Sequence, residues 1–275
     1  MHLRPLPGPA GAFGAAAPYG YGGPLADLDD AGFLARAWTA YTDWCRANGV
    51  LAEFCRFHPE AGNEVFFGAP ARDNRLVVSV DLTLSRLDAQ FSTLARRKLR
   101  LAQSRGAQAR FSQAPADWHR FIGFYREAMT RMQAARWYHF TDAYFAALQA
   151  LPVAWLCICE IEGEWASAGV DLFGESVVEY HLGASTAAGH AAGTAFLLQA
   201  AAARRAQEAG ARSLYLGGGT SQEADNALLF HKKSFSRRLL PFRIAETLHD
   251  EDAYWRRAAL AGHDRERPPA RILLD

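Results

Sequence analysis

A lysine that follows a run of three glycines is the part of this sequence with the clearest chemical potential. The segment 213–236 reads SLYLGGGTSQEADNALLFHKKSFS and contains Gly217, Gly218, Gly219 and Lys232. Glycines let a ligand or another backbone approach without side-chain obstruction, and the alternative is a tight turn without a ligand. Lys232 follows the glycines in an expected short helix, where residue type alone favours an ordinary solvated position beside Lys233.

Two further titratable residues belong to the candidate chemistry. His181 lies near the end of an expected strand, EYHLGAS, and could accept a proton near neutral pH, although a single strand histidine is more often structural. Alternation predicts that His181 and Tyr180 face opposite sides of that strand. Asp225 could orient Lys232 or cap the helix that follows, and we favour the cap.

Length and composition predict a folded domain around these residues. The chain has 275 residues, of which 50% are hydrophobic, enough for one large domain or two small ones. Thirty basic and 29 acidic residues give a formal charge of +1. This balance excludes a whole-protein field for nucleic acid or an anionic membrane, so a polyanion must bind a local patch.

Cysteine usage and hydropathy predict the class of protein. Cys45, Cys55, Cys157 and Cys159 lack the spacing of metal ligands, so we expect buried free thiols and no metal. We find no signal-peptide pattern and no stretch approaching about 20 apolar residues. We therefore expect a soluble, cytoplasmic protein without a membrane span.

Hydrophobic periodicity predicts helices and strands that alternate along the chain, and so an α/β or α+β fold with a mixed sheet. The expected strands are 50–57, 75–84, 107–113, 153–163, 164–174, 176–185, 212–216 and 239–247. The expected helices are 29–48, 85–106, 115–132, 141–151 and 194–209, with a short one after the glycines and one near 251–260. Turn residues between the strands of 153–185 predict an antiparallel meander.

A series of short motifs follows a distinctive order from about residue 18 to residue 258. They are PYGYGGP, CRFHP, VSVDL, ARRKLRLAQSRGAQ, FYREAMTRMQAARWYHF, EYHLGAS, LYLGGG, LLFHKKSFS and PF. Together they resemble the Fem-type, or FemAB-like, branch of the GNAT acyltransferase superfamily. The resemblance implies a degenerate GNAT-like subdomain over 1–105 and a more complete one over 106–275. The Pro-, Gly- and Ala-rich composition of the first residues predicts a flexible tail over 1–17.

The resemblance also implies a reaction. An unprotonated amine would attack the activated carbonyl of an acyl-CoA or an aminoacyl-tRNA and form an amide on a cell-envelope or saccharide-linked acceptor, as in polysaccharide biosynthesis. Lys232 matches the lysine of the family's Phe-Lys-x-x-Phe pattern. The resemblance makes it the candidate cation that stabilises the oxyanion of the tetrahedral intermediate, by about 3 kcal/mol for a well-placed donor. His231 replaces the first aromatic residue of that pattern, and Phe230 lies one place earlier.

Acceptor-binding residues follow from the same resemblance. Tyr180 matches an aromatic acceptor-binding position, and Arg131 matches an arginine that holds a phosphorylated or carboxylated acceptor, for which a guanidinium is suited. Tyr138 would stack or hydrogen-bond beside it, and Arg56 would line the cleft between the subdomains. Arg136 is the alternative match for Arg131, and either arginine could lie on a solvated face.

The donor site implied by the resemblance lies at Gly193 and Thr194, because a helix N-terminus suits a pyrophosphate. The glycine run Gly217, Gly218 and Gly219 is expected to line the acyl-donor cleft beside it. The closely spaced glycines of coenzyme A binders are only loosely present, which weakens the acyl-CoA interpretation. A possible tRNA partner would meet the basic helix 85–106, whose alternative is a solvated face. Its basic residues are Arg96, Arg97, Lys98, Arg100 and Arg105.

Two other function classes remain open at this point. A non-catalytic protein of the same fold would keep the cleft for a nucleotide-sugar or a peptide, and the altered motif at 230–232 favours it. A subunit of a larger assembly would be active only in the reconstituted complex.

Overall fold

The structure is a computed structural model, and it describes residues 1–18, 20–27, 30–219, 226–269 and 271–274. The chain divides into two compact units: unit 1 is Met1–Leu76 with Leu240–Asp275, and unit 2 is Val77–Leu239. The chain passes between them within β4 (Arg72–Asp81) and β10 (Leu239–Leu248). The subdomain boundary near residue 106 stays a prediction.

Unit 1 contains a small mixed sheet with the strand order β1-β2-β3-β10. Its other strands are β1 (His2–Pro5), β2 (Phe13–Ala16) and β3 (Val50–Arg56). The β2–β3 pair is parallel, whereas β1–β2 and β3–β10 are antiparallel. Its helices are α1 (Ala31–Ala47), the 3-10 helix η1 (Asn63–Phe66) and α8 (Glu251–Leu260), of which α1 and α8 pack against β3.

The first 17 residues differ from the flexible tail that their composition suggests. They contain β1 and β2, which pair from His2↔Ala16 to Pro5↔Phe13. Gly8 makes the turn between them at φ 101°, a backbone conformation that glycine adopts without strain. Ala15 and Ala16 are buried, so the small residues let this strand lie close to its neighbours.

Unit 2 contains a larger mixed sheet with the strand order β4-β9-β8-β7-β6-β5. Its strands after β4 are β5 (Gln108–Ser112), β6 (Ala154–Ile161), β7 (Glu164–Phe173), β8 (Val177–Ser185) and β9 (Ser213–Gly217). Strands β6, β7 and β8 form the predicted antiparallel meander, and β8 pairs with β9 in parallel. The mixed α/β fold is therefore confirmed.

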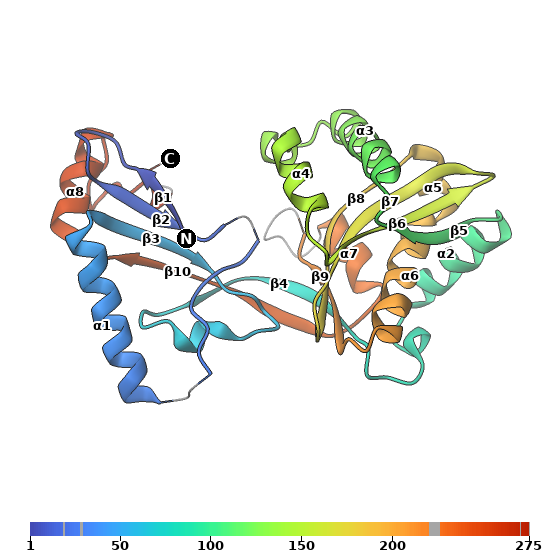
Figure 1. Cartoon of the computed structure of the whole chain (residues 1–275), viewed down its shortest axis with the longest axis horizontal. Helices are drawn as coiled ribbons and strands as arrows, with labels where there is room; N and C mark the ends of the chain where they lie inside the picture. The colour runs from blue at the N-terminus through green and yellow to red at the C-terminus, as the bar shows by residue number, and fades with distance from the viewer. Residues whose placement is uncertain (19, 28–29, 220–225, 270, 275) are drawn as a thin grey trace. The chain divides into compact units, whose positions relative to one another are not determined.

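Helices cover both faces of the unit 2 sheet (Figure 1). On one side α6 (Thr194–Glu208) packs against the sheet and α2 (Thr93–Ser104) packs against α6. On the other side lie α3 (Pro115–Arg131) and α4 (Asp142–Gln149), whose aromatic residues form one core with Ile158, Val170 and Leu182. The remaining helices of unit 2 are η2 (Leu87–Ala89), η3 (Arg136–Tyr138), α5 (Ala187–Ala192) and α7 (Ala227–Lys233).

Helix α2 begins later than periodicity predicts. The expected helix 85–106 divides into the 3-10 turn η2 and α2, which starts at Thr93. Ser92 causes this start because its hydroxyl accepts a hydrogen bond from Ala95 N at 3.1 Å, the pattern of an N-cap.

No described helix is both long enough and apolar enough to cross a bilayer.

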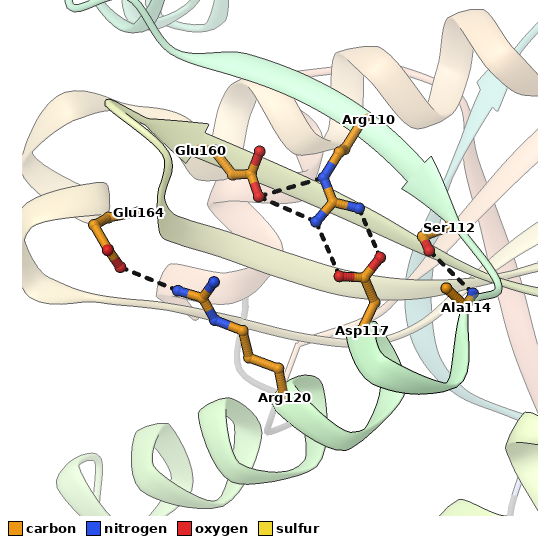
Figure 2. Close-up of polar contacts among 7 residues, drawn as sticks. All are labelled: Arg110, Ser112, Ala114, Asp117, Arg120, Glu160 and Glu164. Atoms are coloured by element: carbon orange, nitrogen blue, oxygen red, sulfur yellow. Dashed lines mark hydrogen bonds and ion pairs between the residues drawn. The ribbon is translucent and has the colours of Figure 1, made fainter.

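One ion-pair cluster fixes α3 to the edge of the sheet (Figure 2). Arg110 on β5 makes two hydrogen bonds to Asp117 in the first turn of α3, at 2.7 and 2.9 Å, and also pairs with Glu160 on β6 at 3.1 Å. The hydrogen bonds from Arg110 lower the pKa of Asp117 to about 2. Arg120 and Glu164 form a separate, more exposed pair nearby.

Candidate active site

Strands β8 and β9 separate in the middle of the unit 2 sheet. Their parallel pairing runs from Val177↔Ser213 to Glu179↔Tyr215, and β8 continues beyond it to Ser185. Backbone groups and side chains beyond Glu179 therefore lie at an opening between two strands. The candidate site is built around this opening.

A β-bulge in β8 lies at Tyr180 and His181, the two site residues predicted on this strand. The register with β7 changes from Asp171↔Tyr180 to Val170↔Leu182, so His181 is the extra residue. Tyr180 packs on the α6 side of the sheet, whereas His181 contacts Tyr144 of α4 on the other side. The prediction that Tyr180 and His181 face opposite sides is confirmed.

The glycine run at the end of β9 receives the Lys232 side chain. Lys232 Nζ donates a hydrogen bond to the carbonyl oxygen of Gly218 at 2.8 Å. Gly217 has φ 76°, and a Cβ atom there would lie 3.3 Å from Nζ. A Cβ at Gly219 would lie 2.5 Å from Oδ1 of Asn226, the N-cap of α7. Gly217 thus makes room for the lysine and Gly219 for the cap of its helix, while Gly218 provides the carbonyl oxygen. Donor binding by the three glycines stays a prediction.

Lys232 is only 8% exposed and lies next to a carboxylate. Burial lowers the pKa of Lys232 to about 7, and the negative charge of Glu179 opposes that shift. Burial likewise raises the pKa of Glu179 to about 7, opposed by Lys232. The two groups therefore titrate together near neutral pH, and Nζ lies 6.0 Å from the centre of the Tyr180 ring. A solvated helix lysine would show none of these features.

His231 occupies the position of the missing aromatic residue. Its ring meets Phe196 edge-on, with centroids 4.5 Å apart, and also contacts Phe235. Burial lowers the pKa of His231 to about 4, so this ring packs in its neutral form. Phe230 is 62% exposed and takes no part in this packing. The pattern in this chain is therefore His231-Lys232-x-x-Phe235, in register with Lys232.

His181 is held by a phenol. Tyr144 Oη lies 2.5 Å from His181 Nε2, and burial lowers the pKa of the imidazole to about 4. His181 is therefore neutral at physiological pH. Its role in catalysis stays a prediction.

The Tyr180 ring lies flat against two glycines of the sheet. A Cβ at Gly169 would lie 3.0 Å from Tyr180 Cε2, and one at Gly183 would overlap its hydroxyl. Burial raises the pKa of the Tyr180 hydroxyl most, and the nearby Asp171 raises it further. Burial also raises the pKa of Asp171 itself, to about 8. The Tyr180 ring therefore lies beside Lys232 Nζ. Acceptor binding by Tyr180 stays a prediction.

The predicted acceptor arginine lies close to the end of β8. Arg131, in the last turn of α3, donates to the carbonyl oxygen of Ser185 at 2.5 Å. Tyr138 lies in η3, and its carbonyl accepts a hydrogen bond from Tyr125 at 3.1 Å. Arg136 is exposed at the start of η3. Acceptor binding by Arg131 and Tyr138 stays a prediction.

The predicted donor residues form the junction between α5 and α6. Gly193 has φ 81°, and a Cβ there would lie 2.8 Å from the carbonyl oxygen of Lys98 on α2. Thr194 is fully buried, and its hydroxyl contacts Ser167 Oγ at 2.5 Å and Gly189 O at 3.1 Å. These contacts explain both residue types structurally. The Gly193 N–H donates to the carbonyl oxygen of His190 at 3.2 Å, so donor binding by Gly193 and Thr194 stays a prediction.

The other predicted residues lie elsewhere. Arg56 belongs to unit 1, where its guanidinium lies over Phe54 and donates to Ala17 O at 3.3 Å, so its predicted role stays a prediction. Asp225 lies outside the described residues, and Asn226 caps α7. Among the described residues, no cluster of three His, Cys, Asp or Glu side chains could hold a metal ion, and the four cysteines are buried free thiols.

Two residues of this arrangement escaped the sequence analysis. Glu179 precedes the Tyr180–His181 pair that the analysis selected, and the signal for it was a carboxylate within an apolar strand. Tyr144 looks like any aromatic residue on the apolar face of a short helix. Only its contact with His181 distinguishes it.

Comparison with protein families and solved structures agrees with this geometry. Residues 89–225 match the family model described as acetyltransferase (GNAT) domain. The chain carries a GNAT acetyltransferase domain. The protein is accordingly an acyltransferase, and the splay between β8 and β9 lies within this domain. No curated protein sequence matches the chain.

Solved structures extend the likeness beyond the GNAT domain. FemX superposes with a TM-score of 0.69 at 13% identity, over 92% of this chain and 84% of FemX. The C-terminal domain assigned to a lysylphosphatidylglycerol synthetase from Agrobacterium fabrum gives 0.63 at 15%, over 94% and 82%. The L-PGS from Bacillus licheniformis gives 0.52 at 14%, over 75% and 70%. The fold is therefore a Fem-like GNAT fold.

Proposed function

We propose that this acyltransferase forms an amide between an acyl or aminoacyl donor and an amine on a cell-envelope or saccharide-linked acceptor. The observation that carries the proposal is Lys232, a buried lysine held against the Gly218 carbonyl where β8 and β9 separate. Among described residues only that hydrogen bond from Nζ is recorded, so further N–H groups remain for a substrate oxygen.

Lys232 would act on the tetrahedral intermediate. The acceptor nitrogen bonds to the acyl carbon, and the carbonyl oxygen gains a negative charge. A protonated Nζ donates a hydrogen bond to that oxyanion, and such a donor is worth about 3 kcal/mol in the transition state. The bond from carbon to the thiol sulfur or to the ribose oxygen then breaks with its electron pair, and the proton lost by the attacking nitrogen ends on that leaving sulfur or oxygen.

The donor is proposed to be an acyl-CoA or an aminoacyl-tRNA. Both carry phosphates, and α2 carries exposed basic side chains close to the start of α6, since its Lys98 carbonyl lies against Gly193. The exposed basic residues are Arg96, Arg97, Arg100 and Arg105. A polyanionic donor would find complementary charge here.

A transfer assay tests the proposal. Radiolabelled acetyl-CoA and radiolabelled alanyl-tRNA serve as donors, and a nucleotide-sugar-linked peptide with a free lysine amine serves as acceptor. We expect label in the acceptor with one of the two donors. Lys232→Met should lower turnover about 100-fold or more while the far-UV spectrum stays native.

The neighbouring lysine provides a matched control. Lys233→Met removes the same charge one residue along α7, where the side chain is half-buried. It should keep turnover within about twofold of native, because substitutions away from a buried polar network have small effects. Equal losses in both variants would contradict the assignment of Lys232. Saturable acceptor binding without turnover from any donor would instead favour the non-catalytic binding protein.

A further inference from the structure

The contact between Tyr144 and His181 has a chemical direction. Their O···N distance of 2.5 Å is short. Hydrogen bonds donated by O–H are shorter than those donated by N–H, and a phenol is a stronger acid than the N–H of a neutral imidazole. The Tyr144 hydroxyl therefore donates to Nε2.

Tyr144 is held in place by its own surroundings. Its ring stacks on Phe140 with centroids 4.1 Å apart and planes 14° apart, and it meets Phe145 edge-on at 5.7 Å. Its backbone N–H binds the Thr141 hydroxyl at the start of α4. The hydroxyl thus has a defined position above the bulge of β8.

The donated proton decides the state of the imidazole. A neutral ring carries one N–H, and when Nε2 accepts a hydrogen bond this N–H is on Nδ1. We propose that Tyr144 is a positioning residue that holds His181 in the Nδ1–H tautomer, so that His181 is a hydrogen-bond donor and not the general base of the reaction. The proton of the attacking amine then ends on the leaving sulfur or ribose oxygen without passing through His181.

The catalytic part of this inference rests on the proposed acyl transfer, whereas the tautomer is a property of the resting protein. Long-range nitrogen–proton NMR of the full chain labelled with ¹⁵N-histidine reads the tautomer directly. We expect the His181 signal of a protonated Nδ1 and an unprotonated Nε2. A protonated Nε2 in the native protein would overturn the proposal.

Variants test whether Tyr144 is the cause. Tyr144→Phe removes the hydroxyl and should convert His181 to the Nε2–H tautomer or to a mixture. Tyr125→Phe removes another phenol from the same core, one that binds the Tyr138 carbonyl, and should leave the His181 tautomer unchanged. An unchanged tautomer in Tyr144→Phe would also overturn the proposal.

Turnover separates a donor from a base. In His181→Asn the side-chain amide N–H can take the place of Nδ1–H, whereas in His181→Gln it takes the place of Nε2. We expect Asn to keep turnover within about tenfold of native and Gln to lose about a further tenfold. The reverse order would contradict the donor role. The predicted tautomer in a protein that transfers no acyl group would sink the proposed function and leave the tautomer assignment standing.

Discussion

Two buried clusters of this protein contain an acid, a base and a tyrosine, one in each unit. In unit 1, Glu53 accepts a hydrogen bond from Tyr41 at 3.0 Å and contacts His249 Nε2 at 3.1 Å. In unit 2, Glu179 and Lys232 lie beside Tyr180. The residue types are alike, but the surroundings differ.

Strand pairing makes the difference. Around Glu53 the pairing of β3 and β10 is continuous, with Glu53↔Thr247 and Ala52↔Leu248, and α1 covers the cluster. At Glu179 the pairing of β8 and β9 stops. A closed cluster can only stabilise the fold, whereas a cluster at a break in the sheet can exchange its hydrogen bonds with a substrate.

The largest effect on stability is expected from removing the carboxylate at the centre of the unit 1 cluster. Glu53→Ala removes the carboxylate that the half-buried Tyr41 hydroxyl and the buried His249 share, and it leaves His249 Nε2 without this partner, whereas the Tyr41 hydroxyl keeps its contact with Met1 Sδ. The loss should lower the free energy of unfolding by about 3 kcal/mol. Urea unfolding of the full chain, native and variant, measures this loss in the free energy of unfolding. Glu246→Ala, on β10, removes a carboxylate that pairs with the exposed Arg72 and should cost less than about 1 kcal/mol. Equal losses would mean that the Glu53 cluster is not specially stabilising.

A change of charge in the open cluster should alter the pH profile rather than stability. The Glu179 charge raises the pKa of Lys232, which is about 7, so Glu179→Gln lowers that pKa further. If protonated Lys232 is the oxyanion donor, the alkaline limb of turnover moves to lower pH. The loss at a fixed alkaline pH is up to about tenfold for each pH unit of movement.

Turnover measured across the pH range tests this change, with Glu175→Gln in the exposed β7–β8 turn as the control. The control should keep the native profile. An alkaline limb that stays in place in Glu179→Gln would show that Lys232 does not limit the reaction.

The smallest effect on stability is expected from the surface ion-pair cluster of Figure 2, which lies where the pairing of β5 and β6 is continuous. Arg110→Met should lower the free energy of unfolding by about 1 kcal/mol, because the Arg110 side chain is 41% exposed and solvent screens the pair. Arg120→Met, which breaks the more exposed pair with Glu164, should have almost no effect.

The sign of the pH dependence follows from Asp117. Its pKa is about 2 in the folded protein, below the value of about 4 in an unfolded chain. The pair therefore contributes fully above about pH 4, and the contribution is lost as pH falls toward 2. The difference in unfolding free energy between native protein and Arg110→Met should shrink over that range. A constant difference would assign the loss to packing instead.

Local patterns predicted most elements of the fold. The helix α1 ends at Asn48 and Gly49 as expected, and the β6–β7–β8 meander has the predicted turns. Periodicity reports which face of an element is apolar, and turn residues act within a few positions. It missed the late start of α2, because Ser92 competes with the periodic pattern by capping, and it missed β1 and β2, because their burial depends on neighbours from elsewhere in the chain.

What the sequence by itself determined is most of the elements, the pattern His231-Lys232-x-x-Phe235 and the glycine run ahead of it, because these depend on residue type and short-range spacing. Only the tertiary structure decided that β8 and β9 separate after Glu179 and that His181 forms a bulge. It also decided that the Tyr144 hydroxyl contacts the His181 ring at Nε2. These features join segments far apart in the chain. The protonation of Lys232, Glu179 and His181 is set by that packing, since burial removes each group from water.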